Sequence, residues 1–205
     1  MPPRTIPLER SEAFLTPSEQ TMLLHIARDS MTAAVRDGRP VDPFSYPLSP
    51  ALQEKHGAFV TLRHGGELRG CIGSVAHQKA IAVSVSENAV NSATRDPRFA
   101  PVRNEEIEHI RIEISALTFG DTPETPFKRV QDIGEIVIGR DGLFVECPPR
   151  RGGLLLPQVA VERGWDVATF LCNVCRKAGY PDNAWQRPDA RLFRFSAQVF
   201  GEEPD

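Results

Sequence analysis

The sequence predicts an α+β fold built on a mainly antiparallel sheet that is flanked by helices. Two pairs of short apolar segments are each joined by a glycine-containing turn, which is typical of β-hairpins. Segments with helical spacing separate these pairs, and residues 110–116 and 193–199 alternate apolar and polar side chains as strands do. A doubly wound parallel sheet would alternate single strands with helices, so the hairpins favour the antiparallel arrangement.

Three segments have clear helix signals. Residues 16–19, with the sequence Thr-Pro-Ser-Glu, combine a capping box with proline at the first helical position, and the amphipathic stretch that follows ends near Gly38. A second helix is expected over about residues 78–95, because an Asp-Pro pair follows it and disfavours the helical conformation. The third spans residues 166–179, between an N-cap aspartate and a glycine stop.

The two expected hairpins span residues 58–72 and 136–145. The first turns at the Gly-Gly pair 65–66, which supplies the positive φ angles of a tight turn. The second turns at the Gly-Arg-Asp-Gly sequence 139–142. A short apolar run at 154–156 then leads into a helix that begins with proline.

The composition is that of a folded globular protein, with 40% hydrophobic and 25% charged residues. The formal net charge of −3 provides no broad positive field, so we expect no nucleic-acid partner. No uncharged apolar run approaches the roughly 18 residues of a membrane span, so no membrane association is expected. Four cysteines are too few for a disulfide scaffold and no secretion signal is recognisable, which predicts reduced thiols in a cytoplasmic protein.

The most unusual local sequence is Gly70-Cys71-Ile72-Gly73, in which two glycines bracket a cysteine. We expect a strand to give way here to a bent loop before the next helix, so that backbone N–H groups face a ligand. The surrounding side chains are mostly basic, with Arg69 adjacent, and would favour a thiolate or an anionic ligand. The alternative is a buried, inert strand cysteine beside glycines that only permit close strand contact.

Other candidate residues have structural explanations as well. Asp96 and Arg98 place an acid and a guanidinium beside a proline turn, either as a ligand site or as a helix stop with a local ion pair. Gln158 could line a pocket or serve as a polar helix residue. Cys172 and Cys175 have C-x-x-C spacing, but no second pair follows and the five histidines lack metal-binding spacing, so we expect no metal site.

Six short sequence blocks, taken in order, resemble the signature of a known family. They are L-R-G-C-I-G (68–73), D-P-R-F (96–99), I-G-R-D-G-L (138–143), L-L-P-Q-V-A (155–160), W-D (165–166) and K-A-G-Y-P (177–181). On these blocks the chain is identified as a member of the AMMECR-type family, the A protein of the AmmeMemoRadiSam group, of which L-R-G-C-I-G is the hallmark.

The resemblance implies an antiparallel sheet with helices, a smaller lobe packed against it and a cleft between the two. It implies a single domain of two lobes over residues 16–200, with an N-terminal tail at 1–15 and a C-terminal tail at 201–205. The signature residues are expected to gather near the cleft, with Cys71 as the candidate catalytic residue and with ligand contacts from Arg69, Gly70, Ile72, Gly73, Asp96, Arg98 and Gln158.

The resemblance assigns no reaction and no cofactor, and it leaves open whether the protein is an enzyme. Family members in bacteria and archaea tend to be encoded beside a Memo-like protein and a radical S-adenosylmethionine (SAM) enzyme, which suggests joint action in a modification pathway. Two functions therefore stand side by side. One is a module that binds or converts a small anionic or nucleotide-like molecule, and the other is a non-catalytic adaptor that docks on one of those partners.

Overall fold

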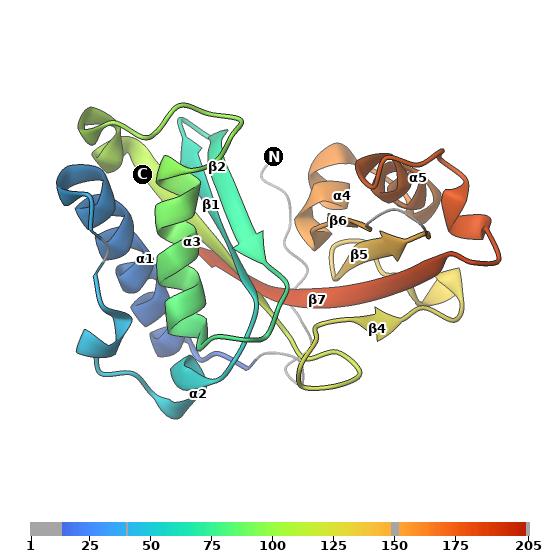
Figure 1. Ribbon diagram of the computed structural model, residues 1–205, viewed down its shortest axis with the longest axis horizontal. Helices are drawn as coiled ribbons and strands as arrows, with labels where there is room; N and C mark the ends of the chain where they lie inside the picture. Colours follow the sequence, from blue (N-terminus) through green and yellow to red (C-terminus); the bar gives the residue numbers. More distant parts are fainter. Residues whose placement is uncertain (1–13, 40, 149–151, 204–205) are drawn as a thin grey trace. The chain divides into compact units, whose positions relative to one another are not determined.

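The computed structural model describes residues 14–39, 41–148 and 152–203, which form two compact units (Figure 1). We call residues 14–117 with 198–203 the motif unit, because they contain L-R-G-C-I-G. Residues 118–197 form the C-terminal unit. The last strand of the chain, β7 (Arg191–Gly201), contributes its first part to the C-terminal unit and its end to the motif unit.

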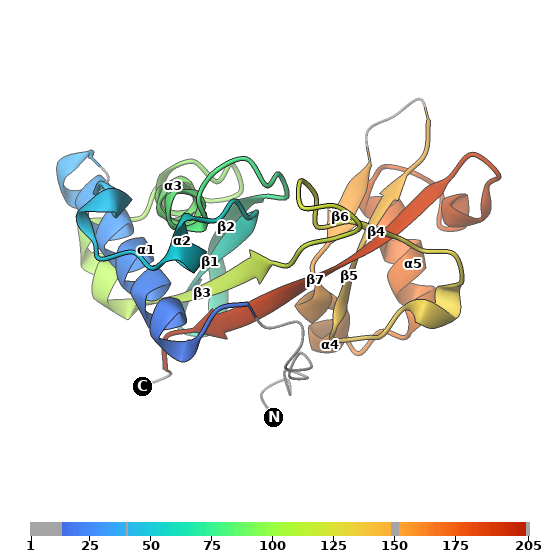
Figure 2. The same ribbon diagram turned by 90° about the horizontal axis from the view of Figure 1, so that it is seen from below.

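The motif unit is an antiparallel sheet covered on one face by helices. Its strands lie in the order β2-β1-β3, with the end of β7 beside β3. Helices α1 and α3 lie side by side and pack on this sheet (Figures 1 and 2). Its elements are α1 (Pro17–Asp37), a 3₁₀ turn (Pro43–Ser45), α2 (Pro50–Gln53), β1 (Ala58–His64), β2 (Glu67–Ser74), α3 (Ile81–Thr94), a second 3₁₀ turn (Asn104–His109) and β3 (Ile110–Leu117).

Alternation of side chains along the strands builds the core of the motif unit. On β1, Val60 and Leu62 are fully buried on the helix-covered face, and they lie opposite Ile114 and Ile112 of β3. The predicted capping box begins α1, where the Glu19 carboxylate accepts the Thr16 N–H at 2.8 Å. Strand periodicity and helix capping in the sequence thus point to the same fold as the tertiary packing.

The C-terminal unit is a second antiparallel sheet with helices on one face. Its strands lie in the order β4-β7-β5-β6, and α4 and α5 pack on one side of them (Figures 1 and 2). The residues facing the helices, among them Leu143 and Val145, form a core with Phe170. Its elements are β4 (Lys128–Arg129), a 3₁₀ turn (Ile133–Glu135), β5 (Asp141–Glu146), β6 (Gly153–Leu155), α4 (Pro157–Arg163), α5 (Val167–Lys177) and a 3₁₀ turn (Ala184–Gln186).

The structure confirms the α+β class, the antiparallel sheet, the three helices with clear sequence signals and the first hairpin, whose Gly65 and Gly66 have φ angles of 59° and 85°. The prediction of a second hairpin over residues 136–145 is wrong. Residues 138–140 form a turn, and the Asp141 carboxylate that follows it accepts the Val137 N–H at 2.8 Å and pairs with Arg140. Strand β5 therefore pairs with β6 and β7.

Residues just outside the expected domain limits, 16 and 200, also make contacts within the fold. Leu15 is buried, and its backbone exchanges two hydrogen bonds with the Gln198 side chain, at 3.0 and 2.8 Å. Gly201 ends β7, and the Glu202 carboxylate accepts the Ile112 N–H at 2.9 Å while it pairs with Arg28. The rest of the expected tails, residues 1–13 and 204–205, lies outside the described residues.

None of the helices in the part of the chain that the structure describes has the length and apolar character that a bilayer span requires.

A histidine occupies the core at the start of the first hairpin. His56 is 0% exposed, its Nδ1 lies 2.8 Å from the carbonyl oxygen of Leu117, and its ring stacks on Phe14 at a centroid distance of 4.2 Å. His77 lies 5.2 Å away, ring to ring, and Glu54 lies 3.7 Å from Nε2. Burial lowers the pKa of His56, and the Leu117 carbonyl and Glu54 only partly offset that shift.

We expect acidification to destabilise the motif unit through His56. Since its pKa is lower in the folded chain than in the unfolded chain, the unfolded chain takes up a proton first as the pH falls below about 6.5. Urea unfolding at pH 7.5, 6.5 and 5.5 should show a loss of stability over this window. The variant His56→Asn should flatten the dependence, whereas His64→Asn, at an exposed position, should keep it. Equal slopes in both variants would show that His56 does not cause the loss.

Candidate functional site

The L-R-G-C-I-G hallmark lies entirely within the edge strand β2. Gly70, Cys71 and Gly73 are paired with Leu62, Thr61 and Phe59 of β1 in antiparallel register. The φ angles of both glycines fall outside the left-handed region. The expected bent loop is therefore wrong, because the segment is a strand that pairs with β1 on both sides of a single register shift at Arg69.

Close packing explains the two glycines. A Cβ atom on Gly70 would lie 2.2 Å from the Ser92 carbonyl oxygen of α3, and one on Gly73 would lie 2.2 Å from the Phe59 ring. Ser92 fastens the same contact, since its hydroxyl accepts the Ile72 N–H at 2.8 Å and donates to the Val60 carbonyl at 2.7 Å. Helix α3 thus meets β2 backbone to backbone, which only residues without side chains allow.

The D-P-R-F block closes the outer edge of β2. Asp96 accepts the Cys71 N–H at 2.8 Å, and Arg98 donates to the Cys71 carbonyl at 3.0 Å. The two side chains also bond each other, with Arg98 nitrogens 2.7 and 2.9 Å from the Asp96 carboxylate. This ion pair satisfies the two groups that a neighbouring strand would use, so it protects the edge from strand addition at Cys71.

Asp96 is the most buried member of this arrangement. Its side chain is 1% exposed, and hydrogen bonds from Arg98 hold its pKa far below the usual range against the opposing effect of burial. The N–H groups of Cys71 and Arg98 lower the pKa further. Asp96 therefore stays ionised, and all its bonding goes to the protein rather than to a ligand.

Arg69 also serves the fold. It pairs with Glu106 at 2.8 and 3.1 Å and donates to the carbonyls of Ala100 and Pro101 at 2.9 and 3.3 Å. Both charged side chains are largely buried, and Arg69 lowers the pKa of Glu106 to about 2. Arg69 thus holds the segment after α3 against β2, and its guanidinium nitrogens already make hydrogen bonds within the protein.

The Cys71 thiol points to the face of the sheet opposite α3. The Thr61 hydroxyl donates to its sulfur at 3.4 Å. Burial raises the pKa of the thiol, and the nearby carboxylates Asp96 and Glu113 raise it further, while Thr61 and Arg98 partly offset the shift. The expectation of a favoured thiolate is therefore wrong, because the basic neighbours in sequence do not face this sulfur in space, Arg98 excepted.

Cys71, Thr61 and Glu113 form a polar row across β2, β1 and β3. Arg98 stands at the end of this row, with half of its side chain exposed. Thr61 and Glu113 could not be found from sequence patterns, because only strand register brings them beside Cys71. Chemically, the row presents a guanidinium beside a neutral thiol, which suits binding of an acceptor group better than nucleophilic attack.

Gln158 lies in the first turn of α4, in the C-terminal unit, so the motif unit brings together the other seven expected residues without it. The C-x-x-C pair lies on α5, where burial raises the pKa of Cys175 to about 11. Within the described residues, no group of three or more His, Cys, Asp or Glu side chains is arranged to hold a metal.

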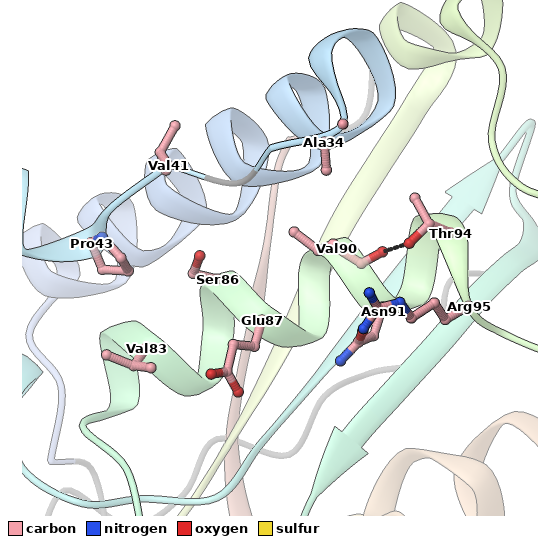
Figure 3. A pocket seen from close by; sticks show the side chains of 11 residues that line it. Ala34, Val41, Pro43, Val83, Ser86, Glu87, Val90, Asn91, Thr94 and Arg95 are labelled. Atoms are coloured by element: carbon pink, nitrogen blue, oxygen red, sulfur yellow. Dashed lines mark hydrogen bonds between the residues drawn. The ribbon is translucent and has the colours of Figure 1, made fainter.

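Two hollows in the surface of the motif unit lie away from the hallmark. One, of about 770 Å³, is lined by α1, α3 and residues 41–43 (Figure 3). The other, of about 480 Å³, is lined by Arg28, Ile107, Glu108, Arg111, Glu202 and Glu203. Neither is lined by a residue of the L-R-G-C-I-G or D-P-R-F block.

Comparison with known proteins gives a consistent result. The family model described as AMMECR1 matches residues 24–200. A protein of Methanothermobacter thermautotrophicus is 40% identical over 198 residues, covering 93% of this chain and 98% of its own, and one of Methanopyrus kandleri is 41% identical over 192 residues, covering 92% and 91%. The crystal structure of an uncharacterized protein from Pyrococcus horikoshii has a TM-score of 0.80 at 37% identity, covering 88% of this chain and 90% of its own.

Replacing Gly70 should harm stability more than replacing Cys71. Gly70→Ala forces a methyl group into the Ser92 backbone, and such overpacking costs about 1–3 kcal/mol in the free energy of unfolding. Cys71→Ser keeps the volume and the contact with Thr61 at a partly exposed position, so its loss should be below about 1 kcal/mol. Urea unfolding of both variants measures the difference. A Cys71→Ser variant as unstable as Gly70→Ala would show that the thiol is a core residue.

The Cys71 thiol should react slowly with iodoacetamide at neutral pH. Because its pKa is raised, the thiolate fraction and hence the alkylation rate should still be climbing above pH 9, with no plateau between pH 7 and 8. Arg98→Gln should slow the reaction further, since Arg98 lowers the pKa of this thiol. Peptide mass spectrometry assigns the rate to Cys71, and Cys71→Ser is the blank. A plateau near neutral pH would establish a thiolate.

Proposed function

The chain belongs to the AMMECR1 family, and we propose that it is a binding module that holds a small anionic or nucleotide-like ligand at Arg98. This proposal rests on one observation: the Arg98 guanidinium is held in place by hydrogen bonds and is still partly exposed. Two of its nitrogens are fixed by Asp96 and the Cys71 carbonyl, yet half of the side chain is exposed. A guanidinium held in this way is a preorganised receptor for carboxylate or phosphate oxygens.

Several contacts support this choice of ligand. The Nη1 atom of Arg98 makes no hydrogen bond within the described residues, so its two N–H groups are available for an anion. The guanidinium also lies 5.5 Å from the centre of the Phe99 ring, which further restricts its motion. The neighbouring neutral thiol of Cys71 adds a soft, weakly polar surface beside the charged group.

The same geometry favours binding over thiol catalysis. A nucleophilic cysteine needs a lowered pKa or an adjacent general base, whereas the pKa of Cys71 is raised and its hydrogen-bond donor is a threonine hydroxyl. Of the expected ligand contacts, Arg98 keeps that role in the proposal, and Cys71, the candidate catalytic residue, becomes a ligand contact beside it. Contacts within the fold position Arg98 and Cys71, and they are made by the other hallmark residues and the anchoring aspartate: Arg69, Gly70, Ile72, Gly73 and Asp96.

The proposed setting is a cytoplasmic pathway shared with a Memo-like protein and a radical SAM enzyme, as the family resemblance implies. The four cysteines are free, which fits a reducing compartment. The alternative function is an adaptor that docks on one of these partners through the Arg98 surface. The exposed Leu68 favours it, because it is an apolar side chain on β2, the strand whose Cys71 carbonyl Arg98 binds, and apolar side chains together with arginine are common in protein contacts.

Replacing Arg98 tests the ligand proposal. Titration with ADP, followed by ¹H–¹⁵N NMR, should show binding to the wild type that weakens at least tenfold in Arg98→Gln, because the phosphate loses its charged partner. Adenosine, which lacks phosphate, should bind weakly to both. Arg163→Gln removes an exposed cation at the end of α4 and is the matched control. A thermal melt of each variant confirms folding, and equal ADP affinity in Arg98→Gln and the wild type would refute the proposal.

The same variants separate the adaptor from the ligand-binding function. A Memo-like or radical SAM partner recovered equally by the wild type and by Arg98→Gln would exclude docking through this surface. Loss of the partner with Arg98→Gln, in a protein that never bound ADP, would favour the adaptor over the binding module.

A further inference from the structure

We infer a second binding site, for the carboxylate of an aliphatic acid, in the hollow that α1, α3 and residues 41–43 line on the motif unit (Figure 3). Its volume of about 770 Å³ lies within the range of roughly 300–1,000 Å³ that is usual for small-molecule sites. It shares no lining residue with the Arg98 surface, so the inference stands apart from the proposed function.

The walls of the hollow are aliphatic. Ala34 of α1, Val41 and Pro43 of the following segment, and Val83 and Val90 of α3 line it (Figure 3). All but the buried Pro43 are partly exposed, so apolar surface remains available to a ligand. A hydrocarbon chain would gain free energy by removing this surface from water.

Two side chains at the rim present hydrogen-bond donors. Asn91 of α3 and Arg95, the residue directly after the helix, are one turn apart and lie together in Figure 3. An Arg95 nitrogen lies 3.4 Å from the Asn91 Oδ1 atom, a long contact that engages the oxygen of the amide. The Asn91 Nδ2 atom makes no hydrogen bond, and Arg95 makes no ion pair, among the residues that the structure describes. Asn91 and Arg95 thus present free donors at the rim, whereas the amide oxygen of Asn91 is engaged.

The charge balance at the rim favours an anion. Glu87 lies one turn before Asn91, but Lys79 binds both of its carboxylate oxygens, at 2.7 and 2.6 Å. Its charge is therefore compensated, and the positive charge of Arg95 is left over. Arg95 also suits the negative C-terminal end of α3, but that contact explains its charge and not the aliphatic hollow beside it.

These two halves define the ligand class. An amide N–H₂ and a guanidinium placed one turn apart match the two oxygens of a carboxylate, and the aliphatic walls match an alkyl chain attached to it. The two hydroxyl groups in the lining are engaged within the protein, since that of Ser86 bonds the Ser30 hydroxyl at 2.8 Å and that of Thr94 donates to the Val90 carbonyl at 2.8 Å. Neither is left to orient a polar ligand body.

Octanoate, 1-octanol and octylammonium are the probes, since they share one chain and differ in the head group. In ¹H–¹⁵N NMR titrations of the full chain, octanoate should shift the amides of α3 and of residues 41–43 and bind at least fivefold more tightly than either analogue. Arg95→Gln and Asn91→Leu should each weaken octanoate binding at least fivefold. Val90→Trp should abolish it by filling the hollow, while Arg163→Gln should leave it unchanged.

The opposite results would overturn the inference. Equal affinity for octanol and octanoate would remove the carboxylate subsite, and shifts confined to other elements would remove the site itself. The variant Arg98→Gln separates the two sites, because it should leave octanoate binding intact whether or not it affects ADP. A loss of octanoate binding in Arg98→Gln would show that the acid binds at the Arg98 surface and that the hollow is not a separate site.

Discussion

The motif unit depends on one buried carboxylate. Asp96 accepts the Cys71 N–H from the edge strand and the guanidinium of Arg98 from its own turn, so it joins the sheet to the segment that leaves α3. A buried charge is tolerable only when it is fully bonded, and Asp96 meets this condition with donors from two elements. These bonds to Asp96 determine the direction of the Arg98 side chain and the path of the chain after α3. They also close the strand edge at Cys71.

A sequence signature can therefore record a packing constraint as much as a reaction. Gly70 is required because α3 meets β2 at the Ser92 backbone, and Arg69 is required because it binds two carbonyls and Glu106 in the next segment. Cys71 is the residue of the block whose side chain leaves this contact for the opposite face, beside Thr61. The block thus fixes the backbone, and what it presents to a ligand is the thiol and the guanidinium of Arg98.

The fold class and most elements could be predicted from sequence because their signals are local: the capping box at Thr16, the Gly65-Gly66 turn and the alternation along β3. The failures have tertiary causes. In the sequence, a glycine such as Gly70, which is needed for close packing against a helix backbone, cannot be distinguished from a glycine that forms a bend. The apolar content of residues 136–138 predicts a strand, but the Val137 N–H donates to the Asp141 side chain and the chain turns at residues 138–140. The row of Glu113, Thr61 and Cys71 depends on strand register, which local sequence patterns do not specify, so it could not be predicted.

Helix α3 connects the two surfaces that carry the proposals. Ser92 faces β2 and bonds its backbone, whereas Asn91, the preceding residue, lies on another face of the helix and lines the hollow. At the end of α3, Arg95 of the hollow is directly followed by Asp96 of the strand edge. The backbone at the end of α3 therefore positions both Arg95, at the rim of the hollow, and Asp96, which holds Arg98. Because α3 is held against β2 by close backbone contact, neither end of this arrangement can shift without disturbing the pairing at Gly70 and Cys71.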